Sequence, residues 1–299
     1  MPKITYINKK FRAARLNTIA TANEIIEEYA QQGYDLTLRQ LYYQMVARGY
    51  IENSERSYKN FGDTIDDGRL AGLIDWSHIV DRTRNLRQNG HWRNPADIMR
   101  SVVRSFQIDK WESQPYRVET WVEKDALVGV ISNVCNRLDV PYFACRGYTS
   151  QSEMWAAAQR LMRYRELGQT PVILHLGDHD PSGIDMTRDI IDRLELFSGG
   201  IEGERLALNW DQIEEHNPPP NPAKLTDSRA EVYVAQYGLE SWELDALDPA
   251  TIASLVEDAV ARFRDNDLWA EALKEEQTGL RQLKQASQRW PEVAAYLAN

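Results

Sequence analysis

The chain has 299 residues, of which 42% are hydrophobic and 27% are charged. These are the values of a globular protein that is long enough for two domains. No apolar run is long enough to cross a bilayer, and the start lacks the apolar core of a secretory signal. The only cysteines, Cys135 and Cys145, are not spaced as zinc ligands. A soluble, cytoplasmic protein with no membrane partner and two buried cysteines is therefore expected.

The net charge of −10 hides an asymmetry between the two parts of the chain. Residues 1–118 carry 18 basic and 14 acidic side chains, whereas residues 119–299 carry 17 basic and 31 acidic ones. The first part is thus the candidate surface for a polyanion such as DNA. Its arginine-rich stretch supplies the predicted DNA-binding residues Arg82, Arg84, Arg87 and Arg93, and continues to Arg100 and Arg104. A solvated charged face is the alternative for any one of these arginines.

Apolar spacing in the first part of the chain predicts three short helices. They cover residues 13–31, the stretch from Thr37 to Gly49, and residues 58–72. A short strand-like segment, I-D-W-S-H-I-V, follows at 74–80. Short helices joined by a tight turn and followed by a small strand ribbon are typical of a winged-helix domain. This mostly helical domain is predicted to cover residues 1–110.

From Tyr116 onward, strand-like and helix-like segments alternate, which predicts an α/β domain with a parallel, Rossmann-like sheet. The strand-like segments are 117–122, 140–144, 172–176 and 206–209. The helix-like segments are 125–138, 151–165 and 184–196. This second domain is predicted to cover residues 111–248. Its prolines make 216–224 an extended connector, and two amphipathic helices form an extension over 249–299.

Acidic side chains follow two strands of the predicted sheet. Glu123 follows the first strand, and Asp178 and Asp180 follow the third, in L-G-D-H-D-P-S-G. Because parallel strands end at the same edge of a sheet, the three carboxylates are expected to meet there. Oxygen ligands of this kind suit Mg²⁺. In the alternative interpretation the D-x-D segment is only a helix-capping turn, and Glu123 pairs with Lys124 or an arginine.

These residues resemble a known family pattern, a strand ending in E-K followed later by D-x-D-P-x-G. The pattern is that of the TOPRIM domain in the A subunit of type IIB topoisomerases (topoisomerase VI) and in the related meiotic double-strand-break transesterases. The chain has Glu123-Lys124 and then Asp178-His-Asp180-Pro-Ser-Gly. The resemblance implies a TOPRIM-type sheet after a winged-helix domain. It also implies that Glu123, Asp178 and Asp180 bind magnesium and act in catalysis.

The same family carries its nucleophilic tyrosine at the end of an R-x-x-[Y/F]-Y motif, which here reads Arg39-Gln40-Leu41-Tyr42-Tyr43. The resemblance implies that Tyr43 is the nucleophile and that Arg39 holds the phosphate or eases ionisation of the phenol. Tyr42 is interpreted as a packing residue, and a tyrosine pair in an amphipathic helix is by itself more typical of a core. Gln40 departs from the family, which usually has an acidic residue there.

The resulting hypothesis is a DNA-binding protein that cleaves a strand by magnesium-dependent tyrosine transesterification. The resemblance further implies a homodimer in which the tyrosine of one subunit meets the metal site of the other. No ATPase glycine motif is present, so ATP-driven strand passage would need a separate B-type ATPase subunit.

Three alternatives remain open for the function. The first is a TOPRIM nuclease that uses water as nucleophile, and the second is a non-catalytic winged-helix DNA-binding or assembly factor. The third is a phosphatase-like enzyme with Asp178 as nucleophile. Glu243 and Asp245 are either auxiliary metal ligands or, as is more common for such a segment, a solvated acidic turn.

Overall fold

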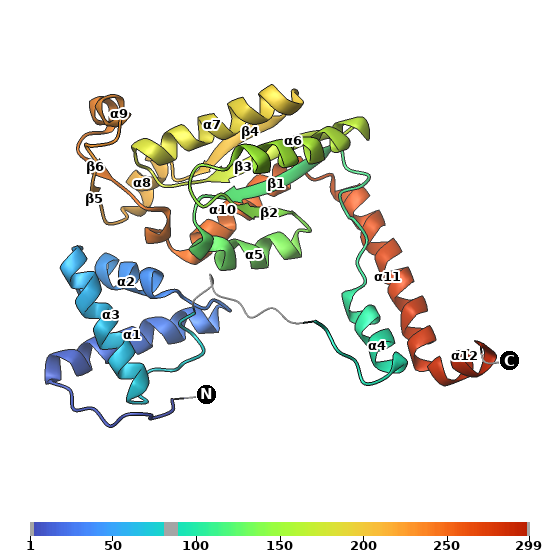
Figure 1. Cartoon of the computed structure of the whole chain (residues 1–299), viewed down its shortest axis with the longest axis horizontal. Coiled ribbons are helices and arrows are strands. Elements are labelled where there is room, and N and C mark those ends of the chain that lie inside the picture. Colours follow the sequence, from blue (N-terminus) through green and yellow to red (C-terminus); the bar gives the residue numbers. More distant parts are fainter. Residues whose placement is uncertain (1–2, 81–88, 298–299) are drawn as a thin grey trace.

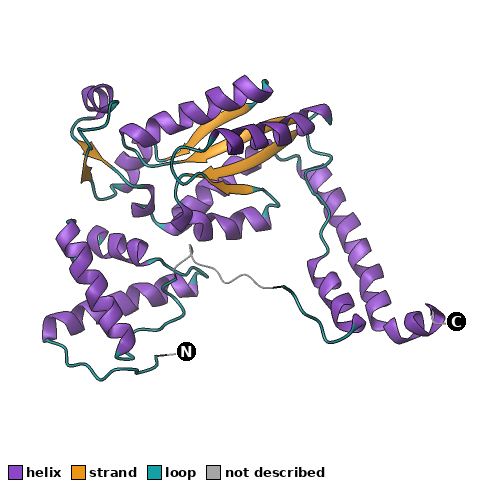
Figure 2. Ribbon diagram, viewed as in Figure 1, coloured by secondary structure: helices purple, strands orange, loops and turns teal. Residues whose placement is uncertain are grey.

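The computed structural model describes residues 3–80 and 89–297 of an α/β protein. N-terminal helices precede a four-stranded parallel sheet with interleaved helices, and further helices follow it (Figures 1 and 2). Arg82, Arg84 and Arg87 of the predicted DNA-binding set lie outside the described residues. Among the described helices, none combines the length and the hydropathy that spanning a bilayer requires.

The N-terminal part contains α1 (Ala13–Gln31), α2 (Leu38–Ala47) and α3 (Glu55–Leu70), close to the predicted ranges. A reciprocal capping box starts α2, because Thr37 and Gln40 each accept the other's backbone N–H. Gln40, the residue that departs from the family pattern, therefore has a structural role. Buried side chains of the three helices form one apolar cluster.

The strand predicted over 74–80 does not form. Asp75 Oδ1 instead accepts the N–H of Ser77 at 2.7 Å, which closes a turn inside the segment. Only isolated bridges occur in this part of the described chain, and they pair Thr5 with Ala71 and Leu36 with Ile79. The strand ribbon expected for a winged-helix domain is therefore reduced to single bridges here.

The sheet has the strand order β2-β1-β3-β4, with all neighbours parallel. Its strands are β1 (Tyr116–Val122), β2 (Tyr142–Ala144), β3 (Thr170–Leu176) and β4 (Glu202–Ala207). The central pair, β1 and β3, is buried almost throughout, as its apolar sequence predicts. The fourth strand was predicted too late, at 206–209, because the polar start of this edge strand lacks the apolar signal of the others.

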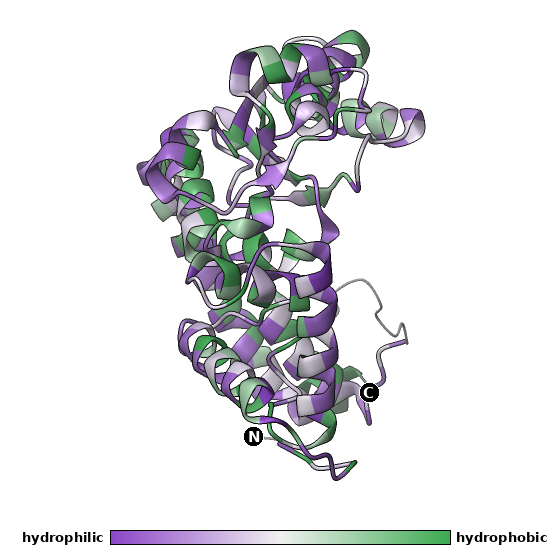
Figure 3. Cartoon of the chain, turned by 90° about the vertical axis from the view of Figure 1, so that its left-hand side faces the viewer, coloured by the Kyte–Doolittle hydropathy of each residue, from purple (hydrophilic) through white to green (hydrophobic). Residues whose placement is uncertain are grey.

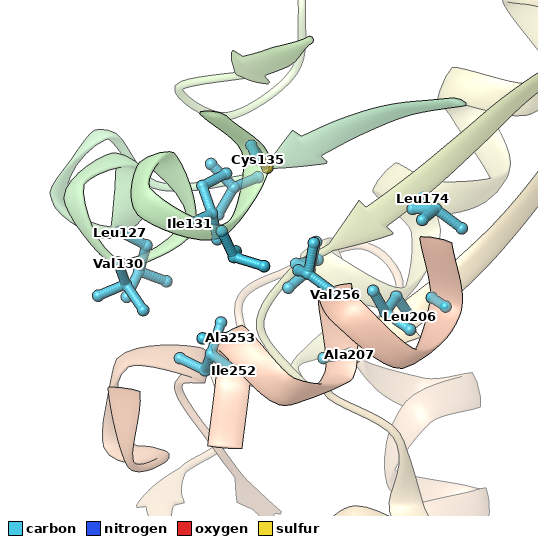
Figure 4. Close-up of a cluster of buried hydrophobic side chains, with 14 of the residues drawn as sticks. Leu127, Val130, Ile131, Cys135, Leu174, Leu206, Ala207, Ile252, Ala253 and Val256 are labelled. Atoms are coloured by element: carbon cyan, nitrogen blue, oxygen red, sulfur yellow. The ribbon is translucent and has the colours of Figure 1, made fainter. Parts of the chain in front are cut away.

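Helices cover both faces of the sheet. On one face lie η1 (Asp125–Leu127), α5 (Val128–Arg137) and α10 (Pro249–Phe263), and on the other lie α6 (Gln151–Glu166) and α7 (Pro181–Ser198). In Figure 4, side chains of α5 and α10, among them Ile131 and Val256, point toward each other and toward the strands. Both cysteines are buried and free. The chain runs from β1 to β2 in one direction and then to β3 in the other, so a crevice is expected beyond the ends of β1 and β3.

Smaller elements complete the sheet region: α8 (Trp210–His216), α9 (Ala230–Tyr237) and η2 (Leu244–Ala246). The proline-rich connector predicted over 216–224 is non-helical only after His216, which ends α8, and β5 (Asn221–Pro222) within it pairs with β6 (Glu240–Ser241).

A helical arm projects from the sheet region (Figure 1). It consists of α4 (Pro95–Ser105), which was not predicted, together with α11 (Asn266–Gln288) and α12 (Trp290–Leu297). The three arm helices contain no buried residue. Figure 3 shows that individual helices of the protein carry both hydrophilic and hydrophobic residues. In the arm, the apolar residues are only partly buried.

Candidate functional site

A pocket of about 690 Å³ opens where α2 approaches the carboxyl ends of β1 and β3. Its lining includes Arg39 and Tyr43 from α2, and Glu123, Asp178 and Asp180 from the edge of the sheet. The pocket therefore contains both the predicted catalytic residues of α2 and the predicted metal-binding residues at the edge of the sheet. It is formed within a single chain.

Glu123 directly follows β1 and is held against the end of β3. Its own N–H donates to the carbonyl of Leu176 at 2.8 Å, and its Oε2 accepts the N–H of Asp178 at 2.9 Å. Burial raises the pKa of Glu123, and the negative charge of Asp180 acts in the same direction. The carboxylate thus links the two strand ends that the sequence placed together.

Asp178 and Asp180 lie just beyond β3, which ends at Leu176, rather than within it. Asp178 Oδ1 accepts the N–H of Leu244 at 2.8 Å, and burial raises the pKa of Asp178 to about 7. Asp180 is the N-cap of α7, since its Oδ1 accepts the N–H of Gly183 at 2.6 Å. The capping interpretation of D-x-D is therefore correct for Asp180, which nevertheless also lines the pocket.

The loop between β3 and α7 is shaped by a glycine and by a buried arginine. A Cβ atom at Gly183 would lie 2.2 Å from the carbonyl oxygen of Asp178, so no side chain fits there. The guanidinium of Arg205 donates to the carbonyls of Gly177 at 2.9 Å, Asp178 at 2.5 Å and Gly183 at 2.8 Å. Arg205 therefore fixes the backbone from which both aspartates project, a role that the sequence did not indicate.

Lys124 lies among three carboxylates. Its Nζ is 2.8 Å from Asp178 Oδ2, 2.7 Å from Glu243 Oε2 and 2.8 Å from Asp245 Oδ1. Burial alone would lower the pKa of Lys124, but the three acidic groups outweigh it and raise the pKa. The alternative interpretation paired Lys124 with Glu123, but the ion-pair partners of Lys124 among the described residues are Asp178, Glu243 and Asp245, which lie far along the chain.

Glu243 and Asp245 do not form a solvated acidic turn. Asp245 is only 1% exposed, and despite its burial the charges of Lys124 and Arg39 lower its pKa. Arg39 forms ion pairs with both acids, and its Nε lies 3.2 Å from Asp245 Oδ2. Glu243 and Asp245 therefore connect Arg39 of α2 to Lys124, which follows β1. No local sequence pattern indicated this connection.

Tyr43 is 4% exposed and its ring reaches the pocket. Its hydroxyl accepts a hydrogen bond from Asn221 Nδ2 at 3.3 Å. Burial raises the pKa of Tyr43, whereas Asn221 and Arg39 act to lower it. The guanidinium carbon of Arg39 lies 5.8 Å from the centre of the Tyr43 ring. Arg39 thus favours ionisation of the phenol, but burial outweighs it in this state.

Tyr42 packs in the interior, as its apolar neighbours predict. Its hydroxyl accepts the N–H of Ser54 at 3.0 Å, at the start of α3. Its ring meets Tyr58 edge-on, with the ring centres 5.0 Å apart. Tyr58 also lines the pocket.

The acidic residues match Mg²⁺ in the type of donor but do not form a closed cage. Among residues 3–80 and 89–297, no group of three or more His, Cys, Asp or Glu side chains is arranged to hold a metal ion. Lys124 takes one oxygen of Asp178, and the N–H of Leu244 takes the other. Mg²⁺ commonly uses only one or two carboxylates and keeps several waters. Glu123 and Asp180 fit such an open site.

The pocket brings together Arg39, Tyr43, Glu123, Asp178 and Asp180. Arg93 is exposed on the segment before α4, remote in sequence from all of them, and does not line this pocket. No protein-family model matches the chain, and no curated protein matches it significantly.

Proposed function

We propose that the protein binds DNA and cleaves a strand by magnesium-dependent tyrosine transesterification, in the manner of the A subunit of topoisomerase VI. In this proposal the N-terminal helices are a reduced winged-helix domain and the sheet is of TOPRIM type. One observation carries the proposal: Tyr43 and the carboxylates Glu123, Asp178 and Asp180 line a single pocket. A buried tyrosine in an amphipathic helix needs no such neighbours for packing alone.

Each of these pocket residues has its own role in the proposed reaction. Tyr43 is the nucleophile, and Arg39 steadies it from the preceding turn of α2. Glu123 and Asp180, joined by Asp178, would hold a magnesium ion, which when bound supplies positive charge near the scissile phosphate. A homodimer and a separate B-type ATPase subunit are also part of this proposal, but each Tyr43 is taken to act with the carboxylates of its own chain, which line the same pocket.

In the proposed step, the phenolic oxygen of Tyr43 attacks a backbone phosphorus. A phosphotyrosyl ester forms to the phosphate at the 5′ end of the broken strand, and the bond from phosphorus to the 3′ oxygen breaks. The phenol loses its proton, and the departing 3′ oxygen takes one up, leaving a free hydroxyl. One phosphodiester is thus exchanged for another, so the phosphotyrosyl ester conserves the bond energy that resealing the strand would need.

An adduct assay tests the proposal. Wild-type protein is incubated with supercoiled DNA and Mg²⁺, denatured, and examined for DNA that remains attached to protein. We expect attachment with wild type and none with Tyr43→Phe. Tyr58→Phe is the matched control because Tyr58 lines the same pocket, and it should retain the adduct. Equal cleavage by wild type and Tyr43→Phe would refute transesterification.

A second candidate is a hydrolase of the same DNA substrate, with water as the nucleophile and Tyr43 as a structural residue. The observation that favours it is the raised pKa of Tyr43, which burial causes and which disfavours the phenolate. This candidate predicts Mg²⁺-dependent cleavage that survives Tyr43→Phe, is lost in Asp178→Ala, and leaves no protein on the DNA. If neither variant affects DNA binding and wild type does not cleave, a non-catalytic DNA-binding factor is the remaining function.

A further inference from the structure

In Figure 1 the helical arm lies on the opposite side from α2 and β5, which contribute residues to the pocket. Its root is anchored, since Trp269 of α11 packs edge-on against buried Trp111 with the ring centres 5.9 Å apart. Further out, α4 packs along α11. A Cβ atom at Gly279 would lie 2.7 Å from Phe106, so glycine permits this close approach. Two segments that are far apart in the sequence thus form one projecting element.

The outer part of this element is basic. We define the distal arm as residues 89–105 and 278–297. Its acidic residues are only Asp97 and Glu292, against six basic ones: Arg93, Arg100, Arg104, Arg281, Lys284 and Arg289. The inner half of α11, residues 266–277, is instead acidic, with Lys274 as its only basic residue. The sign of the charge therefore changes along one helix, in a chain whose net charge is −10.

The basic side chains of the distal arm are available for binding. All six residues are exposed. Arg100 pairs with Asp97 and Arg289 with Glu292 along their own helices, which are weak surface ion pairs. Arg93, Arg104 and Lys284 form no ion pair with any residue that the structure describes. Positive charges on one projecting element repel each other, and binding of a polyanion relieves this repulsion.

We propose that the distal arm is a second DNA-contacting surface, which binds backbone phosphates away from the cleavage pocket. It would supply affinity without reading sequence, because arginine and lysine on phosphates carry no base information. The residues on α11, Arg281 and Lys284, lie outside the basic part of the sequence and join it only through the packing of α4. The inference rests on the proposed function in one respect, that DNA is the ligand.

Charge reversal on the full-length chain tests this surface. Binding of a fluorescent 30-base-pair duplex is measured over a range of salt concentrations in the Tyr43→Phe background, so that no covalent product forms. We expect Arg104→Glu/Lys284→Glu to weaken binding on the order of tenfold or more, and the slope of log affinity against log salt to become shallower by about 2. Lys274→Glu makes a similar change on the acidic half of α11, and it should bind like its parent.

Two outcomes would overturn the proposal. One is binding by the double variant that equals that of the parent in both affinity and salt slope. The other is loss of self-association by the double variant in the absence of DNA, which would make the distal arm an interface between copies of the chain. Circular dichroism checks that each variant is folded. If the parent itself fails to bind DNA, both the proposed function and the role of the distal arm are refuted. If the parent and the double variant bind equally well, only the role of the distal arm is refuted.

Discussion

Lys124 is the residue on which the electrostatics of the pocket depend. Its ammonium group lies within 2.8 Å of oxygens from Asp178, Glu243 and Asp245. Three carboxylates crowded together without a cation would repel each other strongly at the low effective dielectric of a buried site. Lys124 lets them remain close. Lys124 also contacts one oxygen of Asp178, so the charge of Lys124 competes there with that of any cation in the pocket.

Removing this cation should destabilise the fold. Lys124→Met keeps the length of the side chain but leaves the buried carboxylates without their partner, and we expect the free energy of unfolding to fall by about 3 kcal/mol. Urea denaturation at neutral pH measures the change. Lys224→Met is the control, since Lys224 lines the same pocket but is exposed and forms no ion pair with a described residue. It should lie within about 0.5 kcal/mol of wild type. A fully stable Lys124→Met would show that the network contributes nothing net.

At the scale of elements, apolar periodicity placed the buried helices and strands most accurately. The helix over 13–31 was placed at its observed bounds, and the central strands β1 and β3 were placed within two residues of theirs. Burial on both faces gives such strands a continuous apolar run. In contrast, α4, which has no buried residue, was not predicted, because its segment was interpreted from its arginines as a charged surface.

The site followed the same logic. Glu123, Asp178 and Asp180 could be grouped from sequence because each follows a recognisable strand, and parallel strands share an edge. The other acidic residues of the network, Glu243 and Asp245, could not be grouped with them from the sequence. Glu243 and Asp245 lie after β6, a strand of two residues, and their closeness to Lys124 depends on tertiary packing alone. Short-range patterns carry no information about such contacts.

The loop that joins β3 to α7 depends on Gly183. In Gly183→Ala the added methyl would meet the carbonyl oxygen of Asp178 at 2.2 Å, so the loop must move. We expect a loss of about 1–3 kcal/mol in stability and a larger loss of the proposed DNA cleavage, because Asp178 and Asp180 move with the backbone. Thermal unfolding and cleavage are measured in parallel.

The control for this prediction is Gly62→Ala in α3. Its new methyl would lie 3.5 Å from Leu38, an ordinary contact, and alanine favours the helix. Stability should be equal to or above that of wild type. If Gly183→Ala is as stable and as active as the control, the close approach at Gly183 does not constrain the site.

At the scale of the whole molecule, the pocket exists because the N-terminal helices dock on the sheet region. Tyr29 of α1 donates a hydrogen bond to Asp248, and Asn53 Nδ2 donates to the carbonyl of Pro220 at 2.8 Å. Ala246 of η2 belongs to the apolar cluster of the N-terminal helices. Together with the ion pairs of Arg39, these contacts hold α2 over the strand ends. They place Tyr43 beside carboxylates of its own chain.

This arrangement differs from the one that the family resemblance implies, in which the tyrosine acts on the metal site of a partner subunit. A mixing experiment separates the two. Tyr43→Phe and Asp178→Ala chains of different size are co-expressed, so that any assembly contains both, and are then assayed for covalent DNA adducts. Because the pocket is complete within one chain, we expect no adduct from the mixture, as from each variant alone. An adduct on the Asp178→Ala chain, whose Tyr43 is intact, would instead show that the tyrosine works with its partner's carboxylates.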